Sequence, residues 1–253
     1  MSIPIDLASK VALITGASQG IGATLARTFH RAGASVVINH PAIGSTGEDA
    51  EALAAELNRG RPGSAFVIPA DVSIAEAVQG MMAEAKQRFG GIDFLINNAA
   101  IIRDRTISKM SLDEWKSVLD VNLSGVFHCC KFGLEIMRDG GAVVSLGSIA
   151  AIQGFFGQAN YAAAKAGVQA MMRVLSREAA RRNIRANAIA PGVIDTAMAA
   201  TIPEAVRAEM LKNIPLARFA TTEEIANVAL FLCSPLASYI SGQTIEVNGG
   251  WRG

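Results

Sequence analysis

The chain has 253 residues, of which 51% are hydrophobic and 18% charged, and its net charge is +1. This composition excludes a disordered chain, and the near-zero charge gives no electrostatic case for binding nucleic acid or an anionic membrane. No apolar run reaches the roughly 18 residues that cross a bilayer, and the N-terminus lacks the pattern of a signal peptide. The length favours one large domain over residues 1–253.

Seven short apolar runs alternate with helical patterns along the chain. The expected strands are 11–15, 35–39, 65–69, 92–97, 142–146, 184–190 and 244–247. The expected helices lie near 21–32, 46–58, 74–89, 112–137, 158–182 and 222–233, and Ser73 can cap the third. Strands that are apolar throughout and separated by helices predict an α/β fold, a doubly wound parallel sheet of about seven strands with helices on both faces. Residues 193–215 fit this pattern worst, and we expect them to form a substrate lid around a short helical stretch.

A glycine-rich loop separates the first expected strand from the first expected helix. Its glycines, Gly16, Gly20 and Gly22, follow the spacing G-x-x-x-G-x-G instead of the usual G-x-G-x-x-G. Glycine lets the backbone turn tightly and approach a pyrophosphate, and a helix start presents free N–H groups to an anion. The position of this loop favours dinucleotide binding over a turn that only joins strand to helix.

Tyr161 and Lys165 lie four residues apart in an expected helix, and Ser148 precedes the tyrosine by thirteen residues. Positions i and i+4 share a helix face, so Lys165 would place a positive charge beside the phenol and lower the pKa of Tyr161. Such a phenol can donate a proton to a carbonyl oxygen, and Ser148 can donate a second hydrogen bond to that oxygen. By itself, the pair is more often a half-buried tyrosine and a solvated lysine.

With these motifs, the chain resembles the classical short-chain dehydrogenase/reductase family over essentially its whole length. The resemblance also rests on Ala70-Asp71-Val72, Asn97-Asn98-Ala99-Ala100, Asn122, Pro191-Gly192 and Ser241-Gly242-Gln243. Ala100 stands where the family usually has glycine. The resemblance implies a Rossmann-type, NAD(P)-dependent oxidoreductase that transfers a hydride between a nicotinamide and a carbonyl carbon without a metal.

The resemblance implies a role for each of four catalytic residues. Tyr161 would be the general acid, and Ser148 would orient the carbonyl. Lys165 would lower the pKa of the tyrosine and bind the nicotinamide ribose, and Asn122 would hold a water that relays protons to Lys165. As structural alternatives, Asn122 could fill a helix kink and Ser148 could bond the backbone at a strand end.

The resemblance also implies a set of cofactor-binding residues. Asp71 would accept a hydrogen bond from the adenine amino group, unless it caps the next helix, and Val72 would pack nearby. Asn98 would line the cofactor cleft. Pro191, Gly192, Ile194 and Thr196 would meet the nicotinamide and its phosphate. The full expected set is Gly16, Ser18, Gln19, Gly20, Ile21, Gly22, Asn39, His40, Asp71, Val72, Asn98, Ala99, Tyr161, Lys165, Pro191, Gly192, Ile194 and Thr196.

The residues after the second expected strand bear on the choice of cofactor. Asn39-His40-Pro41 lacks the acidic residue that would hold the ribose 2′-OH of NAD and repel a 2′-phosphate. Ser45 and Thr46 could donate to a phosphate, although no arginine stands there and Gln19 occupies a position that is often basic in NADP-preferring relatives. We therefore expect NADP(H). Alternatively, His40 is a partly exposed loop histidine without a ligand.

Three segments, 157–167, 102–104 and 243–250, resemble 3-oxoacyl-carrier-protein reductases and acetoacetyl-CoA reductases. This implies reduction of a 3-oxoacyl thioester, carried on coenzyme A or acyl carrier protein, in fatty acid metabolism. The turn 137–141 is shorter and less basic than those reductases typically have, which puts docking of a carrier protein in question. The alternatives are a carbonyl reductase or alcohol dehydrogenase for a small ketone, sugar or cyclic alcohol, and a non-catalytic regulator that senses NADP(H).

The resemblance further implies a homotetramer built on the helices that contain Asn122 and Tyr161. Apolar residues along 112–137 would form that interface, unless they pack only on the sheet: Trp115, Leu119, Leu123, Phe127 and Met137. The three cysteines have neither metal-ligand spacing nor the even number of a disulfide framework. We therefore expect no metal site, and buried free thiols in a cytoplasmic enzyme.

Overall fold

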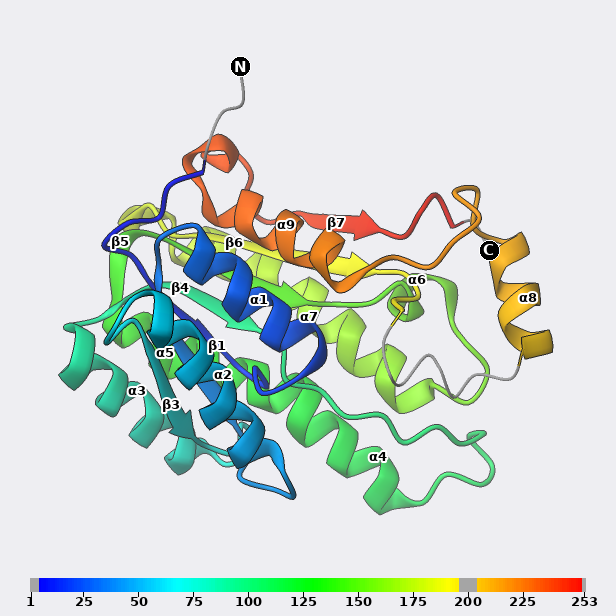
Figure 1. Cartoon of the computed structure of the whole chain (residues 1–253). Coiled ribbons are helices and arrows are strands. Elements are labelled where there is room, and N and C mark those ends of the chain that lie inside the picture. The colour runs from blue at the N-terminus through cyan, green and yellow to red at the C-terminus, as the bar shows by residue number, and fades with distance from the viewer. Residues whose placement is uncertain (1–4, 196–203, 252–253) are drawn as a thin grey trace.

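The computed structural model describes residues 5–195 and 204–251, and its framework is one seven-stranded sheet (Figure 1). The strand order is β3-β2-β1-β4-β5-β6-β7, and every neighbouring pair is parallel. The order reverses direction between β1 and β4, which confirms the doubly wound α/β fold. The strands are Val11–Ile14 (β1), Ser35–His40 (β2), Ala65–Pro69 (β3), Ile92–Asn97 (β4), Met137–Leu146 (β5), Arg185–Pro191 (β6) and Thr244–Val247 (β7).

Helices cover both faces of the sheet, as the sequence predicted. On one face α1 packs along α9, and α2 lies beside α1 (Figure 1). On the other face lie α3, α5 and α7. The α-helices are Gly20–Arg31 (α1), Thr46–Gly60 (α2), Ala75–Phe89 (α3), Leu112–Leu119 (α4), Gly125–Ile136 (α5), Ala150–Gln153 (α6), Ala159–Glu178 (α7), Glu204–Lys212 (α8) and Thr222–Cys233 (α9).

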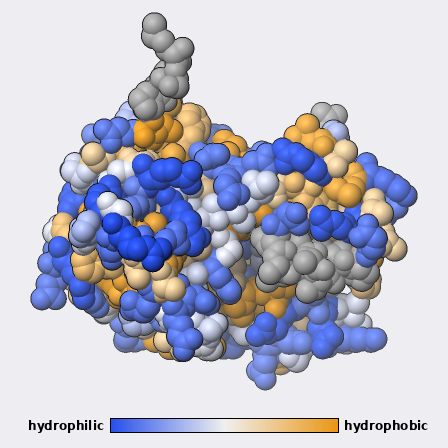
Figure 2. Space-filling view, in the orientation of Figure 1, coloured by the Kyte–Doolittle hydropathy of each residue, from blue (hydrophilic) through white to orange (hydrophobic). Residues whose placement is uncertain are grey.

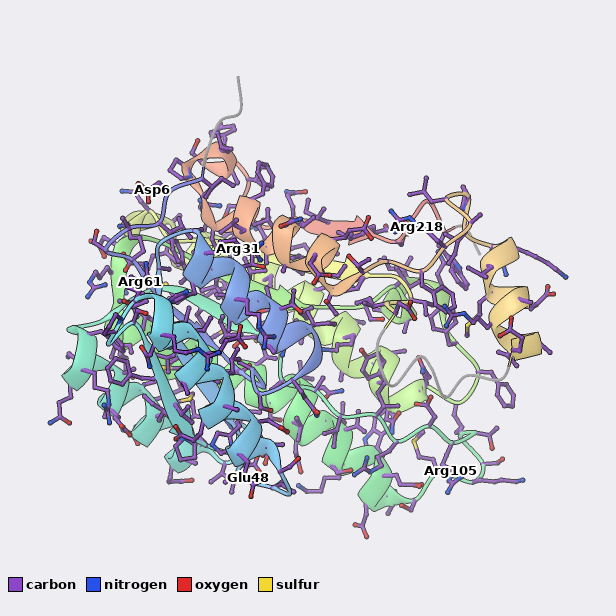
Figure 3. The ribbon with its side chains drawn as sticks, viewed as in Figure 1. Asp6, Arg31, Glu48, Arg61, Arg105 and Arg218 are labelled. Atoms are coloured by element: carbon purple, nitrogen blue, oxygen red, sulfur yellow. The ribbon has the colours of Figure 1, made fainter. Side chains whose placement is uncertain are left out.

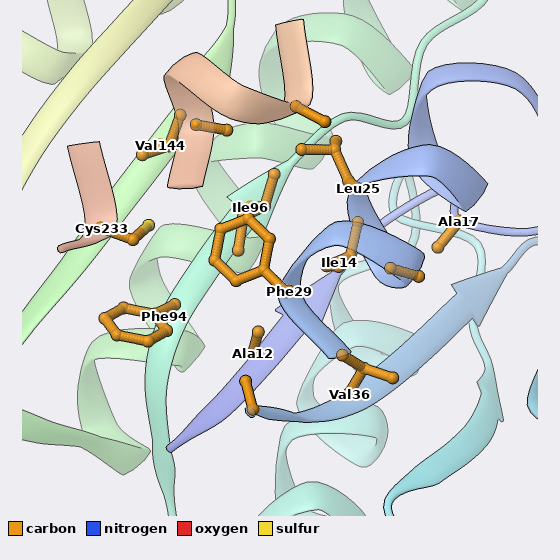
Figure 4. Packing of buried hydrophobic residues seen from close by; sticks show 14 of the residues in the cluster. Ala12, Ile14, Ala17, Leu25, Phe29, Val36, Phe94, Ile96, Val144 and Cys233 are labelled. Carbon is orange, nitrogen blue, oxygen red and sulfur yellow. The ribbon is translucent and has the colours of Figure 1, made fainter. Parts of the chain in front are cut away.

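Successive side chains of a strand point to opposite faces of the sheet, and each face therefore has its own core. In β1, Ala12 and Ile14 pack under α1 and α9, whereas Val11 and Leu13 pack against the helices of the other face. Figure 4 shows the first of these cores, where Phe29 of α1 meets Phe94 of β4 edge to face at 6.1 Å. Burial on both sides explains why the strands read as continuous apolar runs.

The surface of the molecule is more polar than these two cores. The side of the molecule shown in Figure 2 is mostly hydrophilic, with hydrophobic residues visible in patches between the polar ones. Among residues 5–195 and 204–251, no helix combines the length and apolar character needed to cross a membrane.

Three expectations differ from the structure. The helix expected over 112–137 is divided into α4 and α5 by a π-helical segment, η1, over Asp120–Ser124. Strand β5 begins at Met137 instead of residue 142. Ser73 does not cap α3, because its hydroxyl donates to Oδ1 of Asp71 at 2.7 Å and Ile74 occupies the N-cap position.

Candidate active site

The predicted site residues gather at the carboxyl ends of the strands, on the loops that follow and the helices to which these loops lead, around the point where the strand order reverses. This is where open α/β sheets bind ligands. In Figure 3, Arg105, on the loop after β4, lies at this end of the sheet, whereas Arg61 lies at the opposite end. Arg61 donates to the Gly33 carbonyl just before β2, at 2.6 Å.

The glycine loop has a conformation that other residues would disturb. Gly16 and Gly20 have φ values of +60° and +55°, in the left-handed region that favours glycine. A Cβ atom on Gly22 would lie 2.2 Å from the Gly16 carbonyl oxygen, and one on Gly16 would lie 2.8 Å from Cα of Ala99. The loop leads directly into α1, with Gln19 at its N-cap in an extended conformation. This cradle fits a pyrophosphate, because the N-terminal amides of a helix attract an anion.

A hydrogen-bonded layer beneath the loop holds it to β4. The Thr15 hydroxyl accepts hydrogen bonds from the backbone N–H groups of Asn98 and Ala99, at 3.0 and 3.1 Å. In return, Nδ2 of Asn98 donates to the carbonyl oxygens of Thr15 and Gly16, both at 2.9 Å. The Asn98 side chain therefore holds the glycine loop to the end of β4.

Two further predicted cofactor residues, at the end of β2, are buried. Oδ1 of Asn39 accepts from the Gly16 N–H at 3.3 Å, and its Nδ2 donates to the Ala70 carbonyl at 3.0 Å. Nδ1 of His40 accepts from the Ala42 N–H at 3.0 Å, and burial lowers the pKa of His40, although the Glu51 carboxylate opposes this. The alternative of a partly exposed loop histidine is wrong, because His40 is a buried residue of β2.

Ser148, Tyr161 and Lys165 come together as predicted from their spacing. Lys165 is only 2% exposed, and its ammonium donates to the Leu146 carbonyl at the end of β5 at 2.7 Å. Nζ lies 5.6 Å from the centroid of the Tyr161 ring, so the two side chains share a face of α7. Burial lowers the pKa of Lys165 to about 8.

The predicted lowering of the Tyr161 pKa by Lys165 is not met, because the pKa of Tyr161 is raised and Lys165 is not among the causes of the shift. Burial of the phenol raises the pKa of Tyr161, the Ser148 hydroxyl lowers it, and the Asp104 carboxylate raises it. The Lys165 ammonium donates to a backbone carbonyl instead of the phenol. The net result is a phenol that keeps its proton at neutral pH.

The Asn122 and Ser148 side chains both bond the backbone, which is the structural alternative stated for Ser148. Asn122 is fully buried in η1, where its Oδ1 accepts from the Ile101 N–H at 2.8 Å and its Nδ2 donates to the Ile101 carbonyl at 2.9 Å. The Ser148 hydroxyl accepts from the Ala150 N–H at 3.0 Å while remaining close enough to Tyr161 to shift its pKa. These bonds fix both residues beside the loops of the site.

Two buried amides at the site were missed by the sequence analysis. Gln169 donates from Nε2 to the Ser148 carbonyl at 3.0 Å, and Asn160 accepts from the Tyr161 N–H at 2.7 Å. Gln169 lies four residues after Lys165, on the same helix face. That spacing was a usable signal, whereas nothing in the sequence distinguishes Asn160 from an exposed helix-start asparagine.

The remaining predicted residues line the same end of the sheet. Oδ1 of Asp71 accepts from the Ser73 N–H at 2.9 Å, and Gly125 of α5 lies against Val72. Pro191 ends β6 and accepts from the Ile149 N–H at 3.1 Å. Gly192 and Ile194 follow it, Ser18 and Ile21 belong to the glycine loop and the start of α1, and Thr196 lies outside the described residues.

A cavity of about 570 Å³ opens beside the glycine loop, between α1 and α2. Ser18, Gln19, Arg27 and Glu56 are among its lining residues, and Arg27 and Glu56 form a salt bridge at 2.6 Å. Among the described residues, no group of three or more His, Cys, Asp and Glu side chains could hold a metal ion. All three cysteines are buried free thiols, as expected.

Comparisons with known proteins agree with this geometry. A family model described as "Enoyl-(Acyl carrier protein) reductase" matches residues 16–252. The chain is 40% identical to a 3-oxoacyl-(acyl-carrier-protein) reductase of Aquifex aeolicus (97% of this chain, 98% of the relative) and 43% identical to one of Staphylococcus aureus (96% and 98%). A short-chain dehydrogenase/reductase of Brucella melitensis superposes with a TM-score of 0.92 at 38% identity, covering 98% of each chain. A metagenomic blue fluorescent protein in complex with NADPH gives a TM-score of 0.92 at 31% identity, covering 98% of this chain and 100% of that one. The chain therefore belongs to the short-chain dehydrogenase/reductase family and is an NAD(P)-dependent oxidoreductase.

Proposed function

We propose that this enzyme uses NADPH to reduce a 3-oxoacyl thioester, carried on coenzyme A or acyl carrier protein, to the 3-hydroxyacyl thioester. The observation that carries the proposal is the meeting of Ser148, Tyr161 and Lys165 at the carboxyl end of β5. Two relatives that match nearly the whole chain at 40% and 43% identity are named 3-oxoacyl-(acyl-carrier-protein) reductases. The name of the family model, an enoyl reductase, makes an enoyl thioester the appropriate comparison substrate.

Each catalytic residue would act at one point of the reaction. The bound dinucleotide supplies the hydride. Tyr161 donates the proton to the carbonyl oxygen, since its raised pKa keeps the phenol protonated, and the Ser148 hydroxyl donates a hydrogen bond to the same oxygen. Lys165 binds the nicotinamide ribose. Asn122 would hold the water that relays protons to Lys165, and two hydrogen bonds between its side chain and Ile101 fix its place in η1.

NADP(H) is favoured by the end of β2, which carries no acidic side chain to repel a 2′-phosphate. Thr46, the first residue of α2, places its hydroxyl 3.4 Å from Nδ1 of His40, at the carboxyl end of β2. A relative in the same fold was solved with NADPH. The test is the ratio of kcat/KM for NADPH to that for NADH, and a preference for NADH would overturn this assignment.

The substrate class is tested with purified enzyme, NADPH and a panel of carbonyl compounds. Acetoacetyl-CoA and a 3-oxoacyl carrier protein should be reduced faster than crotonyl-CoA, small ketones or sugars. Faster reduction of a small ketone would support the alternative of a carbonyl reductase. Tight NADPH binding without oxidation by any of these compounds would support a sensor.

We also propose a homotetramer, a cytoplasmic location and a lid. Leu112, Trp115 and Phe127, on α4 and α5, are exposed apolar side chains, which suits a subunit interface. Buried free thiols suit a reducing compartment. The short helix α8 lies within 193–215, and its Met210 and Leu211 pack on a small core around Trp251. NADPH-dependent protection of α8 from proteolysis would support closure.

A further inference from the structure

Asn160, the residue before the proposed acid, is a fully buried polar side chain with three hydrogen bonds. Its Oδ1 accepts from the Tyr161 N–H at 2.7 Å. Its Nδ2 donates to two backbone carbonyls, those of Arg103 at 3.0 Å and Glu114 at 3.1 Å. A buried amide with this many partners is expensive to disturb, because each partner would be left unpaired away from water.

The three partners belong to three different parts of the fold. Tyr161 lies in the first turn of α7, where backbone N–H groups have no acceptor within the helix. Arg103 lies on the loop after β4, and Glu114 lies in the first turn of α4. One side chain therefore ties the start of the catalytic helix to two elements that precede it by more than forty residues.

The loop segment 101–105 is tied to the site at further points along its length. Its first residue, Ile101, is paired with Asn122 through two bonds of 2.8 and 2.9 Å. Its last residue donates a backbone N–H to the Gly157 carbonyl at 2.9 Å, and Nε2 of Gln158 donates to Asp104 at 2.9 Å. Between these two ends of the segment, Asn160 bonds the Arg103 carbonyl, and it also bonds the N–H of the neighbouring Tyr161.

We propose that Asn160 is a positioning residue, which fixes the Tyr161 phenol opposite Ser148 by anchoring the start of α7 to segment 101–105 and α4. The inference rests on the proposed role of Tyr161 as the acid. A displacement of a catalytic group by about 1 Å can cost about 100-fold in rate. Loss of the anchor should therefore lower kcat, while the glycine loop, which Asn160 does not touch, continues to bind NADPH.

The test compares Asn160→Asp with a matched control, Asn187→Asp. The aspartate at 160 keeps the size of the side chain and the acceptor for the Tyr161 N–H, but it presents an oxygen to the two carbonyls. Asn187 is also buried and joins two segments, since it donates to the Ile240 carbonyl at 2.8 Å and accepts from the Gln243 N–H at 3.0 Å. It has no contact with the residues of the proposed mechanism among its hydrogen bonds in the described part of the chain.

In folded Asn160→Asp, kcat should fall about 10- to 100-fold, with the Kd for NADPH within about threefold of wild type. The deuterium isotope effect on kcat with 4-deuterated NADPH should rise, because the misplaced acid makes the chemical step slower. Folded Asn187→Asp should lose thermal stability but keep kcat within about twofold. A wild-type kcat and isotope effect in Asn160→Asp would overturn the inference, as would equal losses of kcat in both variants.

Two further variants make the outcome decisive. If Asn160→Asp does not purify as a folded protein, Asn160→Ser carries the same test, because its short neutral side chain cannot span to Arg103 and Glu114. Tyr161→Phe separates the inference from the proposed function. Activity retained in Tyr161→Phe would refute the acid role itself, whereas an inactive Tyr161→Phe beside a fully active Asn160→Asp would refute only the positioning role.

Discussion

At Lys165, the sequence motif predicted the neighbour of the side chain but not its burial. The spacing of Tyr161 and Lys165 correctly predicted that the two side chains lie together. It could not predict their burial, which depends on the whole fold, and burial is the largest influence on the pKa of both groups. For the same reason, the sequence could not show that Asn39 and Asn98 turn inward to support the glycine loop.

Burial of Lys165 makes the stability of the enzyme depend on pH. The pKa of Lys165 falls from 10.5 to about 8 on folding, so between these values the unfolded chain holds a proton that the folded protein has released. Stability contributed by this residue therefore rises with pH across that window, by about 3 kcal/mol in total. The measurement is denaturant unfolding of wild type and Lys165→Met between pH 8 and 10.5.

The free energy of unfolding of wild type minus that of Lys165→Met should increase with pH. Burial also raises the pKa values of Cys129, Cys130 and Cys233, which opposes the trend, but these thiols are present in both proteins and cancel in the difference. A difference that stays constant across the window would show that the Lys165 ammonium is not destabilised by burial.

Helices and strands were predicted most accurately where the residues on one or both of their faces are apolar without interruption. The strand bounds agree within a residue for every strand except β5, and β1, β2, β3 and β4 each contribute residues to both cores. The π-helical segment η1 escaped prediction, because the apolar pattern continues through it while Asn122 bonds a loop distant in sequence. The glycine loop was recognised from its place between β1 and α1.

The close contact of α1 with the glycine loop predicts the effect of a single methyl group. In Gly22→Ala the new Cβ would lie 2.2 Å from the Gly16 carbonyl oxygen, so the loop must shift. We expect NADPH binding weaker by at least about tenfold and a loss of stability of about 1–3 kcal/mol. The measurements are NADPH titration by fluorescence and thermal unfolding.

The matched control is Gly80→Ala, in α3. A Cβ there has no neighbour within 4 Å, so this variant should bind NADPH normally and be slightly more stable, since alanine favours a helix over glycine. Unchanged NADPH affinity in Gly22→Ala would contradict the tight packing of α1 on the loop.

At the scale of the whole molecule, the exposed apolar side chains of α4 and α5 predict self-association. Trp115 is 39% exposed and Phe127 is 51% exposed, whereas Met137, expected at the same interface, is buried in the core. A charge at the interface should split the assembly, so Phe127→Glu should elute at a lower mass than wild type in gel filtration. Ile43→Glu, at a 65% exposed position outside these helices, should elute with the wild type.

A wild-type protein that elutes as a monomer at every concentration would contradict the proposed tetramer.

The fold itself was fully predicted at this scale, because strand and helix patterns alternate along the chain and crossovers are right-handed. The substrate could not be predicted in the same way, since the residues around the mouth of the site follow no periodic pattern that would reveal what they bind.

The measurement that tests the central claim most directly is the turnover of Tyr161→Phe with NADPH and acetoacetyl-CoA. Removing one hydroxyl leaves the ring in place, so the variant should bind NADPH with an affinity close to that of wild type. Its kcat should fall by at least about 100-fold, because no group remains to protonate the carbonyl oxygen. Wild-type turnover by Tyr161→Phe would contradict the account.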